Sequence, residues 1–352
     1  MAKALHEFLK TMVSKGASDL HIGAGTPPLI RVDGSLYPLT DTPLSSEQSQ
    51  AICYEVLSQE HIMKFEQDLE LDLSFAIKDL ARFRANLYWQ QHSVTGAFRQ
   101  IPFQIPKFEE LGLPKLVQDL AYKPHGLVLV TGTTGSGKST TLAAMINAMN
   151  QVKPWHIITV EDPIEFVFTS KKCLIHQREV GRDTTSFQNG LKYCLREDPD
   201  MVMVGEMRDL ETVRAALTIA ETGHLVLATL HTNTAVQTID RIIDIFPSHQ
   251  QNQVRSQLAT ILQGILCQQL LPKVEKGRVL ALEILIPNPA MRNLIRENKI
   301  HQVYAQMQLS QTETGMQTMN QSLANLVKNK SVKTEEALAR SPDLEELRKQ
   351  LG

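Results

Sequence analysis

A nine-residue segment rich in glycine and hydroxyl side chains constrains this chain more than any other part of its sequence. It fits the pattern G-x-x-x-x-G-K-S/T in full, between a short apolar run and a helix-forming stretch. Glycines let the backbone turn its N–H groups toward phosphate oxygens, and the following helix presents its positive end to the same anion. We therefore predict a nucleoside triphosphate site made by Gly132, Thr133, Thr134, Gly135, Ser136, Gly137, Lys138, Ser139 and Thr140.

After residue 113, short apolar runs alternate with helical stretches. The runs lie at residues 127–130, 157–160, 201–204, 225–228 and 279–286. Continuous runs rich in β-branched residues are typical of strands buried on both faces of a parallel sheet. The pattern predicts an α/β, doubly wound domain whose last helix is capped by Ser341, with Pro342 at its first position.

The first hundred residues have a different, mixed α and β pattern. Apolar spacing predicts a helix at residues 4–15, a hairpin at 28–38 that turns at Asp33–Gly34, and strands at 70–75 and 82–99. With 352 residues, the chain is long enough for about two domains. We expect an α+β domain over residues 1–100, a proline-containing linker over 101–113 and the α/β domain over 114–352.

Charge and composition disfavour several classes of protein. The formal net charge is −2 and only 5% of residues are aromatic, which argues against a nucleic-acid partner. The four cysteines are scattered without a close pair, so we expect buried free thiols rather than a zinc site or disulfides. No apolar run of 18 residues occurs, and the first ten residues carry charges, so we expect a cytoplasmic protein without a transmembrane segment or signal peptide.

Charged residues follow three of the apolar runs at the point where each run ends. Glu161 and Glu165 follow the second run, Glu206 follows the third, and His231 follows the fourth. Because open α/β sheets bind ligands at the carboxyl ends of their strands, we expect these side chains to meet the phosphate loop. One carboxylate would support Mg²⁺ through water, another would orient or deprotonate the attacking water, and His231 would sense the γ-phosphate.

The order and spacing of four segments resemble the Walker A, Asp box, Walker B and His box of the type II/IV secretion ATPase superfamily. These segments are Gly132–Thr140, Thr159–Glu165, Arg196–Asp209 and Thr229–Asn233. The similarity continues in Ser18–His21, Arg31–Gly34 and Arg82–Arg84. In addition, Ala290–Glu297 (AMRNLIRE) is similar to the AIRNLIRE motif of PilT-type retraction ATPases of the type IV pilus.

This resemblance implies a hexameric, ATP-driven motor with a PAS-like N-terminal domain and a RecA-like C-terminal domain. Such a motor would lie at the cytoplasmic face of the inner-membrane pilus machine and drive pilus disassembly and twitching motility. The implied partners are identical subunits, an inner-membrane platform protein and a second retraction ATPase, without nucleic acid.

The resemblance also implies a role for individual residues of the ATPase domain. Lys138 and Ser139 would hold phosphate and Mg²⁺, and Glu206 would be the Walker B carboxylate near Mg²⁺, directly or through water. Glu165 would be the catalytic base, with Glu161 as the alternative. His231, described above, would be the contact made by the His box.

Three arginines of the N-terminal domain, Arg82, Arg84 and Arg99, resemble the positions from which this family supplies charge across subunits. Such an arginine stabilises the transition state of phosphoryl transfer. Two residues depart from the family pattern, since Thr133 stands where proline is usual and Met291 where isoleucine is usual. We expect little loss of nucleotide binding from the first change, and near-intact helix packing after the second.

Other functions compete with the retraction motor. Extension and secretion ATPases of the same family typically carry a tetracysteine zinc insert, which the scattered cysteines do not provide. A PilU-like accessory ATPase is harder to exclude, although the near-intact AMRNLIRE segment favours the PilT type. A nucleic-acid-translocating RecA-like motor and a non-catalytic ATP-binding scaffold stay open, the former disfavoured by the net charge.

Overall fold

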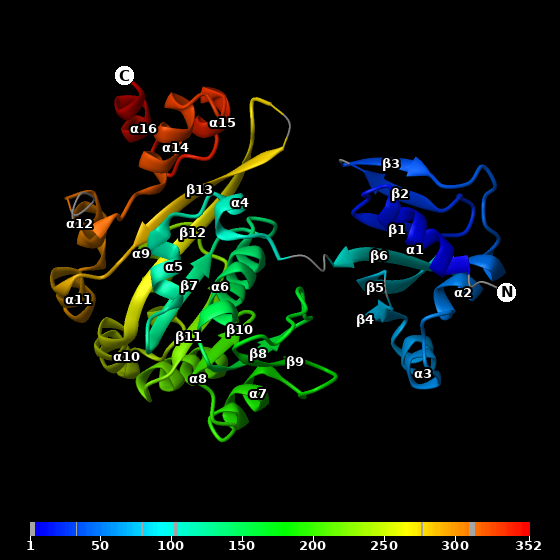
Figure 1. Cartoon of the computed structure of the whole chain (residues 1–352), viewed down its shortest axis with the longest axis horizontal. Coiled ribbons are helices and arrows are strands. Elements are labelled where there is room, and N and C mark those ends of the chain that lie inside the picture. Colours follow the sequence, from blue (N-terminus) through cyan, green and yellow to red (C-terminus); the bar gives the residue numbers. More distant parts are fainter. Residues whose placement is uncertain (1–3, 33, 79, 102–104, 276, 310–313) are drawn as a thin grey trace. The chain divides into compact units, whose positions relative to one another are not determined.

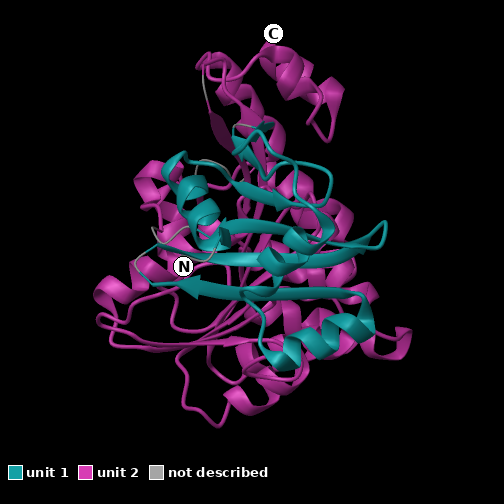
Figure 2. Ribbon diagram, turned by 90° about the vertical axis from the view of Figure 1, so that its right-hand side faces the viewer, with its two compact units in different colours: residues 1–104 teal, residues 105–352 magenta. Residues whose placement is uncertain are grey.

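The computed structural model describes residues 4–32, 34–78, 80–101, 105–275, 277–309 and 314–352 (Figure 1). The chain divides into two compact units, residues 1–104 and 105–352, which Figure 2 draws in different colours. Each unit has its own sheet and its own apolar core.

The first unit is a six-stranded antiparallel sheet combined with helices. Its elements are α1 (Ala4–Ser14), β1 (Asp19–Ile22), β2 (Leu29–Val32), β3 (Ser35–Pro38), α2 (Ser46–Tyr54), α3 (Gln59–Asp68), β4 (Glu70–Ile77), β5 (Ala81–Gln90) and β6 (Ser93–Ile101). The strand order is β3-β2-β1-β6-β5-β4. Leu9 and Phe65 of the helices share a core with Phe83 and Phe98 of the sheet.

Several elements of this unit are those that the sequence predicts, whereas β1, α2 and α3 were not predicted. The predicted helix, the two strands of the hairpin and the alternating strands are all confirmed. Asp33, expected in the turn of that hairpin, lies outside the described residues. Because only one face of the sheet meets the core, buried and polar residues alternate along β5, and this alternation is what made the strands predictable.

The second unit contains a seven-stranded sheet with helices on both faces (Figure 1). Its elements are α4 (Phe108–Leu111), α5 (Lys115–Ala121), β7 (Gly126–Thr131), α6 (Lys138–Val152), β8 (His156–Glu161), β9 (Leu174–Glu179), α7 (Phe187–Cys194), β10 (Met201–Val204), α8 (Leu210–Glu221), β11 (Leu225–Leu230), α9 (Ala235–Asp244), α10 (Ser248–Ile261), β12 (Leu262–Pro272), β13 (Arg278–Leu285), α11 (Pro289–Arg296), η1 (Ile300–Gln302), α12 (Val303–Leu309), α14 (Met319–Lys328), α15 (Thr334–Leu338) and α16 (Leu344–Leu351). The strand order is β13-β12-β7-β11-β10-β8-β9.

Two apolar cores lie on the two sides of this sheet. Leu127 and Leu129 of β7 belong to one core, whereas Val128 and Val130 of the same strand belong to the other. This alternation means that every side chain of the strand is buried, as the continuous apolar run predicts. The predicted α/β class and the RecA-like arrangement are thus confirmed.

Three features of the sheet differ from the sequence prediction. The strands β9 and β12 were not predicted, because their sequences, LIHQRE and LQGILCQQLLP, mix polar with apolar residues. The run at residues 279–286 forms β13, which pairs antiparallel with β12 instead of joining the parallel set. Only residues 273–277 separate these two strands, and a parallel connection needs a crossover of a dozen or more residues.

The segment predicted as a linker, residues 101–113, has a different structure. Ile101 ends β6, and residues 102–104 lie outside the described residues. The following residues belong to the second unit, where α4 buries Phe108, and Leu113, just after this helix, is also buried. The prolines suggested a linker, but the apolar residues between and after them bring the segment into a core.

Two details of the C-terminal helices also depend on side-chain contacts. The last helix begins at Leu344 with Asp343 as its N-cap, so the prediction of Ser341 as the cap was wrong. The Ser341 hydroxyl instead accepts a hydrogen bond from the Asp343 backbone N–H at 3.2 Å. In the AMRNLIRE segment, Arg292 donates to the carbonyl oxygens of Ala259 and Leu262, so its guanidinium caps the end of α10.

The four cysteines are buried free thiols, as predicted. Burial raises the pKa of each thiol, to about 12 for Cys53 and for Cys194. The pKa values of Cys173 and Cys267 are raised by burial as well. In the described part of the chain, no helix combines the length and apolar character that crossing a membrane requires.

The burial of Phe108 leads to a stability prediction. We expect Phe108→Ala to lower the free energy of unfolding by about 3 kcal/mol, because it removes a buried aromatic ring from the core. A phenylalanine in a solvated linker would change it by roughly 0.5 kcal/mol or less. Denaturant unfolding measures the difference, with Glu109→Ala on the exposed side of the same helix as control. Equal effects of the two variants would contradict a core position for Phe108.

Candidate nucleotide site

The phosphate loop between β7 and α6 is built on glycines whose backbone other residues rarely adopt. The φ angles of Gly132, Gly135 and Gly137 are +139°, +79° and +92°. At Gly132 there is also no space for a side chain, since a Cβ would lie 2.4 Å from the carbonyl oxygen of Gln268. These conformations turn the loop sharply at the start of α6, which places a helix N-terminus behind it.

Lys138, the first residue of α6, is buried and its ammonium group faces the loop. Its Nζ donates to the carbonyl oxygens of Gly132 at 2.9 Å and of Thr133 at 3.1 Å. Burial lowers the pKa of Lys138, and the nearby carboxylates of Glu206 and Glu165 act in the opposite direction. The charges of two predicted site residues, Glu165 and Glu206, therefore act on the ammonium group of Lys138.

The hydroxyl residues of the loop differ in exposure. Thr133 and Thr134 are exposed, whereas Ser139 and Thr140 are half-buried in the first turn of α6. Ser136 is buried, and its Oγ has no hydrogen-bond partner among the residues that the structure describes. An unpartnered buried hydroxyl in a phosphate loop is available to an oxygen of a ligand.

Glu206 and His231 meet at the carboxyl ends of two neighbouring parallel strands, β10 and β11. The Nε2 of His231 lies 3.1 Å from Oε1 of Glu206, and a guanidinium nitrogen of Arg208 lies 2.7 Å from the other carboxylate oxygen. Burial works against ionisation of Glu206, but Arg208 and His231 together lower its pKa. Arg208 was not predicted as a site residue, although it follows the same strand only a few residues after Glu206.

The two carboxylates that follow β8 have different environments. Glu161 is buried, and its Oε1 accepts hydrogen bonds from Thr159 Oγ1 at 2.6 Å and from Gln177 Nε2 at 3.1 Å. Burial raises the pKa of Glu161 to about 7. Glu165 is exposed, and its charge acts on Lys138. Of the two, Glu165 is therefore the one open to a water molecule.

The three predicted arginines lie on strands of the first unit, while the phosphate loop lies in the second. Arg84 and Arg99 are directly opposite each other on β5 and β6. Arg99 forms an ion pair with Asp19 at 2.8 Å, and Arg84 lies 3.7 Å from Asp72. Arg82 donates to the Ser74 hydroxyl at 2.9 Å.

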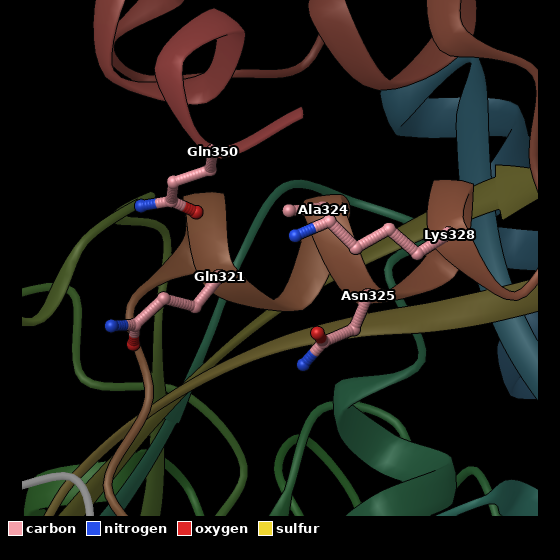
Figure 3. Close-up of a pocket in the computed structure, with 5 residues that line it drawn as sticks. All are labelled: Gln321, Ala324, Asn325, Lys328 and Gln350. Carbon is pink, nitrogen blue, oxygen red and sulfur yellow. The ribbon is translucent and has the colours of Figure 1, made fainter. Parts of the chain in front are cut away.

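A cavity of about 280 Å³ between α14 and α16 is separate from these residues. Figure 3 shows its lining, which consists of four polar residues and one alanine: Gln321, Ala324, Asn325, Lys328 and Gln350. None of the predicted site residues lines it. The chemistry predicted from the sequence thus gathers at the strand ends and not in this cavity.

The sequence and the fold both match a described protein family. The model of the type II/IV secretion system protein family matches residues 1–339. The chain belongs to this family. Its two units correspond to the antiparallel N-terminal domain and the RecA-like domain that the resemblance implied.

Three relatives of this family member cover nearly its whole length. PilT, the type IV pilus retraction ATPase of Pseudomonas aeruginosa, is 50% identical over 331 residues, which is 94% of this chain and 96% of PilT. A twitching motility protein of Neisseria gonorrhoeae is 48% identical, over 91% of this chain and 86% of its own. PilU of P. aeruginosa is 42% identical, over 97% and 90%.

A solved structure supports the same branch of the family. The crystal structure of the pilus retraction motor PilT with bound ADP has a TM-score of 0.93 and 54% sequence identity to this chain. The match covers 99% of this chain and 100% of that one. The chain is therefore a PilT-type member of the family.

The buried position of Glu161 predicts a pH dependence of stability. Its pKa of about 7 lies above the ordinary value of 4.5, so between these values the folded state binds a proton that the unfolded state does not. Stability therefore falls as the pH rises through this window. In Glu161→Gln this loss is absent, and relative to wild type the variant gains on the order of 1–3 kcal/mol between pH 5 and pH 8.

Denaturant unfolding at several pH values checks this expectation. The control is Glu211→Gln, which removes an exposed carboxylate from α8. A difference between Glu161→Gln and wild type that does not change with pH would show that Glu161 titrates as an ordinary exposed glutamate does.

Proposed function

We propose that this chain is an ATPase motor that drives retraction of type IV pili, and with it twitching motility. The observation that carries the proposal is the environment of Lys138, where a phosphate loop, Glu165 and Glu206 come together at the ends of parallel strands. Membership of the family and the names of the PilT relatives support the choice of process. By analogy with them, the motor is a homohexamer at the cytoplasmic face of the inner membrane, bound to a platform protein of the pilus machine.

ATP is the proposed substrate, and the residues present fit its triphosphate. The backbone N–H groups of the loop and the N-terminus of α6 would bind the phosphates, and the Ser136 hydroxyl is free to join them. Lys138 would exchange its two carbonyl partners for β- and γ-phosphate oxygens. Ser139 and Glu206 fit a Mg²⁺ ion, directly or through water, because hydroxyl and carboxylate oxygens are its usual ligands.

In the hydrolysis step, a few side chains have separate roles. Mg²⁺, when bound, neutralises charge on the β- and γ-phosphates. Glu165, exposed and ionisable, would orient or deprotonate the attacking water, and His231 would contact the γ-phosphate while its Nε2 stays near Glu206. Arg208 supports this arrangement by holding the second oxygen of Glu206. Thr133 and Thr140 complete the loop without a separate chemical role.

The first test measures phosphate release by purified protein. We expect Lys138→Ala and Glu165→Gln each to lower ATP turnover by about a hundredfold or more, because they remove phosphate binding and water activation respectively. Glu165→Gln should keep its affinity for a fluorescent ATP analogue, whereas Lys138→Ala should lose most of it. Glu211→Gln is the matched control on an exposed carboxylate. Tight ATP binding without turnover in the unaltered protein would favour a non-catalytic scaffold.

The assignment to retraction needs a test in cells. Deletion of the gene should leave cells with many pili and no twitching, because pili would extend without being withdrawn. Cells without pili would indicate an extension motor instead. Supplying this chain to cells that lack every retraction ATPase separates the PilT-like from the PilU-like role, since an accessory ATPase would restore twitching only beside a second retraction ATPase.

A nucleic-acid-translocating motor is the second candidate, because RecA-like sheets serve many functions. Its only specific support is the fold, and the net charge of −2 argues against it. Stimulation of ATP turnover by single-stranded DNA would favour it over the pilus motor.

We also propose that Arg82, Arg84 and Arg99 act on the ATP of a neighbouring subunit. Their support is the resemblance to the family and the location of all three arginines on the neighbouring strands β5 and β6 of the first unit. Arg82→Ala should therefore lower turnover about tenfold or more while ATP affinity is retained. Lys78→Ala, which removes another exposed cation from the same unit, is the control.

Mixed oligomers distinguish action between subunits from action within one. Lys138→Ala and Arg82→Ala subunits are each expected to be nearly inactive alone. When mixed, some sites combine an intact loop from one subunit with an intact arginine from the other, and part of the activity should return. No recovery on mixing, or loss of ATP affinity in isolated Arg82→Ala subunits, would contradict the proposal.

A further inference from the structure

We propose that Gln177, on the edge strand β9, is a positioning residue that holds Glu165 in place for ATP hydrolysis. The inference rests on the proposed function of Glu165 and names a residue outside the four sequence motifs. Gln177 acts through the backbone of the segment that carries Glu165, because it forms hydrogen bonds with the backbone of Phe166 and Phe168. That segment, residues 162–168, is called the catalytic segment below.

The carboxamide of Gln177 makes three hydrogen bonds around the catalytic segment. Its Nε2 donates to the Phe166 carbonyl oxygen at 2.7 Å, and its Oε1 accepts from the Phe168 backbone N–H at 2.9 Å. The same Nε2 donates to Oε1 of Glu161 at 3.1 Å. One side chain thus ties both sides of residue 167 to the sheet and also joins the buried carboxylate that precedes the segment.

Two further side chains hold the backbone just before this point. Oε2 of Glu179, which lies two residues after Gln177 on β9, accepts from the Ile164 backbone N–H at 3.2 Å. Oε2 of Glu161 accepts from the Glu165 backbone N–H at 3.4 Å. The catalytic segment contains neither helix nor strand, so these side chains supply partners that regular structure would otherwise provide.

Glu165 depends on this support because its own side chain makes no hydrogen bond to the residues that the structure describes. The side chain has several rotatable bonds, so the backbone on either side determines only which positions the exposed carboxylate can reach. A displacement of about 1 Å in a reacting group can cost about a hundredfold in rate. Hydrogen bonds to the backbone at residues 164, 166 and 168 therefore limit the positions from which the carboxylate can act.

Only a carboxamide meets all three contacts of residue 177. Glutamate at this position has no N–H for the Phe166 carbonyl, and it would place a second carboxylate against Glu161. Alanine removes all three hydrogen bonds. His176, the preceding residue on β9, makes its contact with His156 instead, at 2.9 Å between ring nitrogens. It provides a control on the same edge strand.

The experiment compares Gln177→Ala, Gln177→Glu and His176→Ala as full-length proteins. We expect both changes at residue 177 to lower kcat for ATP by about tenfold to a hundredfold, with KM and the affinity for an ATP analogue unchanged. His176→Ala should retain wild-type kcat. Unchanged kcat in both Gln177 variants would overturn the proposal, as would an equal loss of ATP affinity. If Gln177→Ala fails to fold, Gln177→Glu, which keeps the size of the side chain, decides by the same criteria.

A double-mutant cycle tests whether Gln177 acts through Glu165. In a Glu165→Gln background, adding Gln177→Ala should lower the residual turnover by less than about twofold, because the group being positioned is already gone. A full additional tenfold loss would mean that Gln177 acts independently of Glu165, which contradicts positioning.

Hydrogen exchange supplies a readout that does not depend on turnover. Amides of the catalytic segment, measured as the peptide over residues 162–168, should exchange about tenfold faster in Gln177→Ala than in wild type and unchanged in His176→Ala. An unchanged exchange rate in Gln177→Ala would contradict the proposal that Gln177 holds the catalytic segment in place. A wild-type protein without ATPase activity would overturn the proposed function, while the exchange experiment would still report whether Gln177 holds the segment.

Discussion

The strands β7, β10 and β11 are buried along their whole length, and β8 along nearly all of it, because helices cover both faces of the sheet. Along such a strand there is no place for an exposed polar group. The polar side chains of the site therefore lie just after the buried strands end, in the loop after Thr131 and at Glu206 and His231. Parallel pairing brings these ends to the same edge of the sheet. The site is a consequence of how the core is packed.

Much of this arrangement could be predicted from the sequence, because the signals are local. The glycines of the loop are required by backbone angles, and the fully apolar strands mark their own ends. Gln177 could not be found in the same way. Its role depends on contacts with the irregular segment that follows Glu161, and neither periodicity nor a motif shows which edge strand lies beside that segment. For the same reason β9 itself was missed, since its half-polar sequence shows no clear pattern.

Other differences between sequence and structure have similar causes. Phe108 looked like part of a linker because of the prolines near it, but its burial depends on a core made by distant strands and helices. Asp343 caps the last helix although Ser341 has an equally suitable side chain, and the choice depends on where the chain turns. Arg292 lies in a segment identified by family resemblance, and its contacts with carbonyl oxygens of α10 give it a structural role within the subunit.

The positions of the cysteines provide a way to follow how this protein unfolds. A buried thiol with a raised pKa reacts with alkylating reagents almost only after the surrounding structure has separated. Cys53 belongs to the core of the first unit, and Cys173, Cys194 and Cys267 to the cores of the second. The four native thiols thus form a set of internal probes, and mass spectrometry of labelled peptides can tell which unit unfolds first without any engineered label.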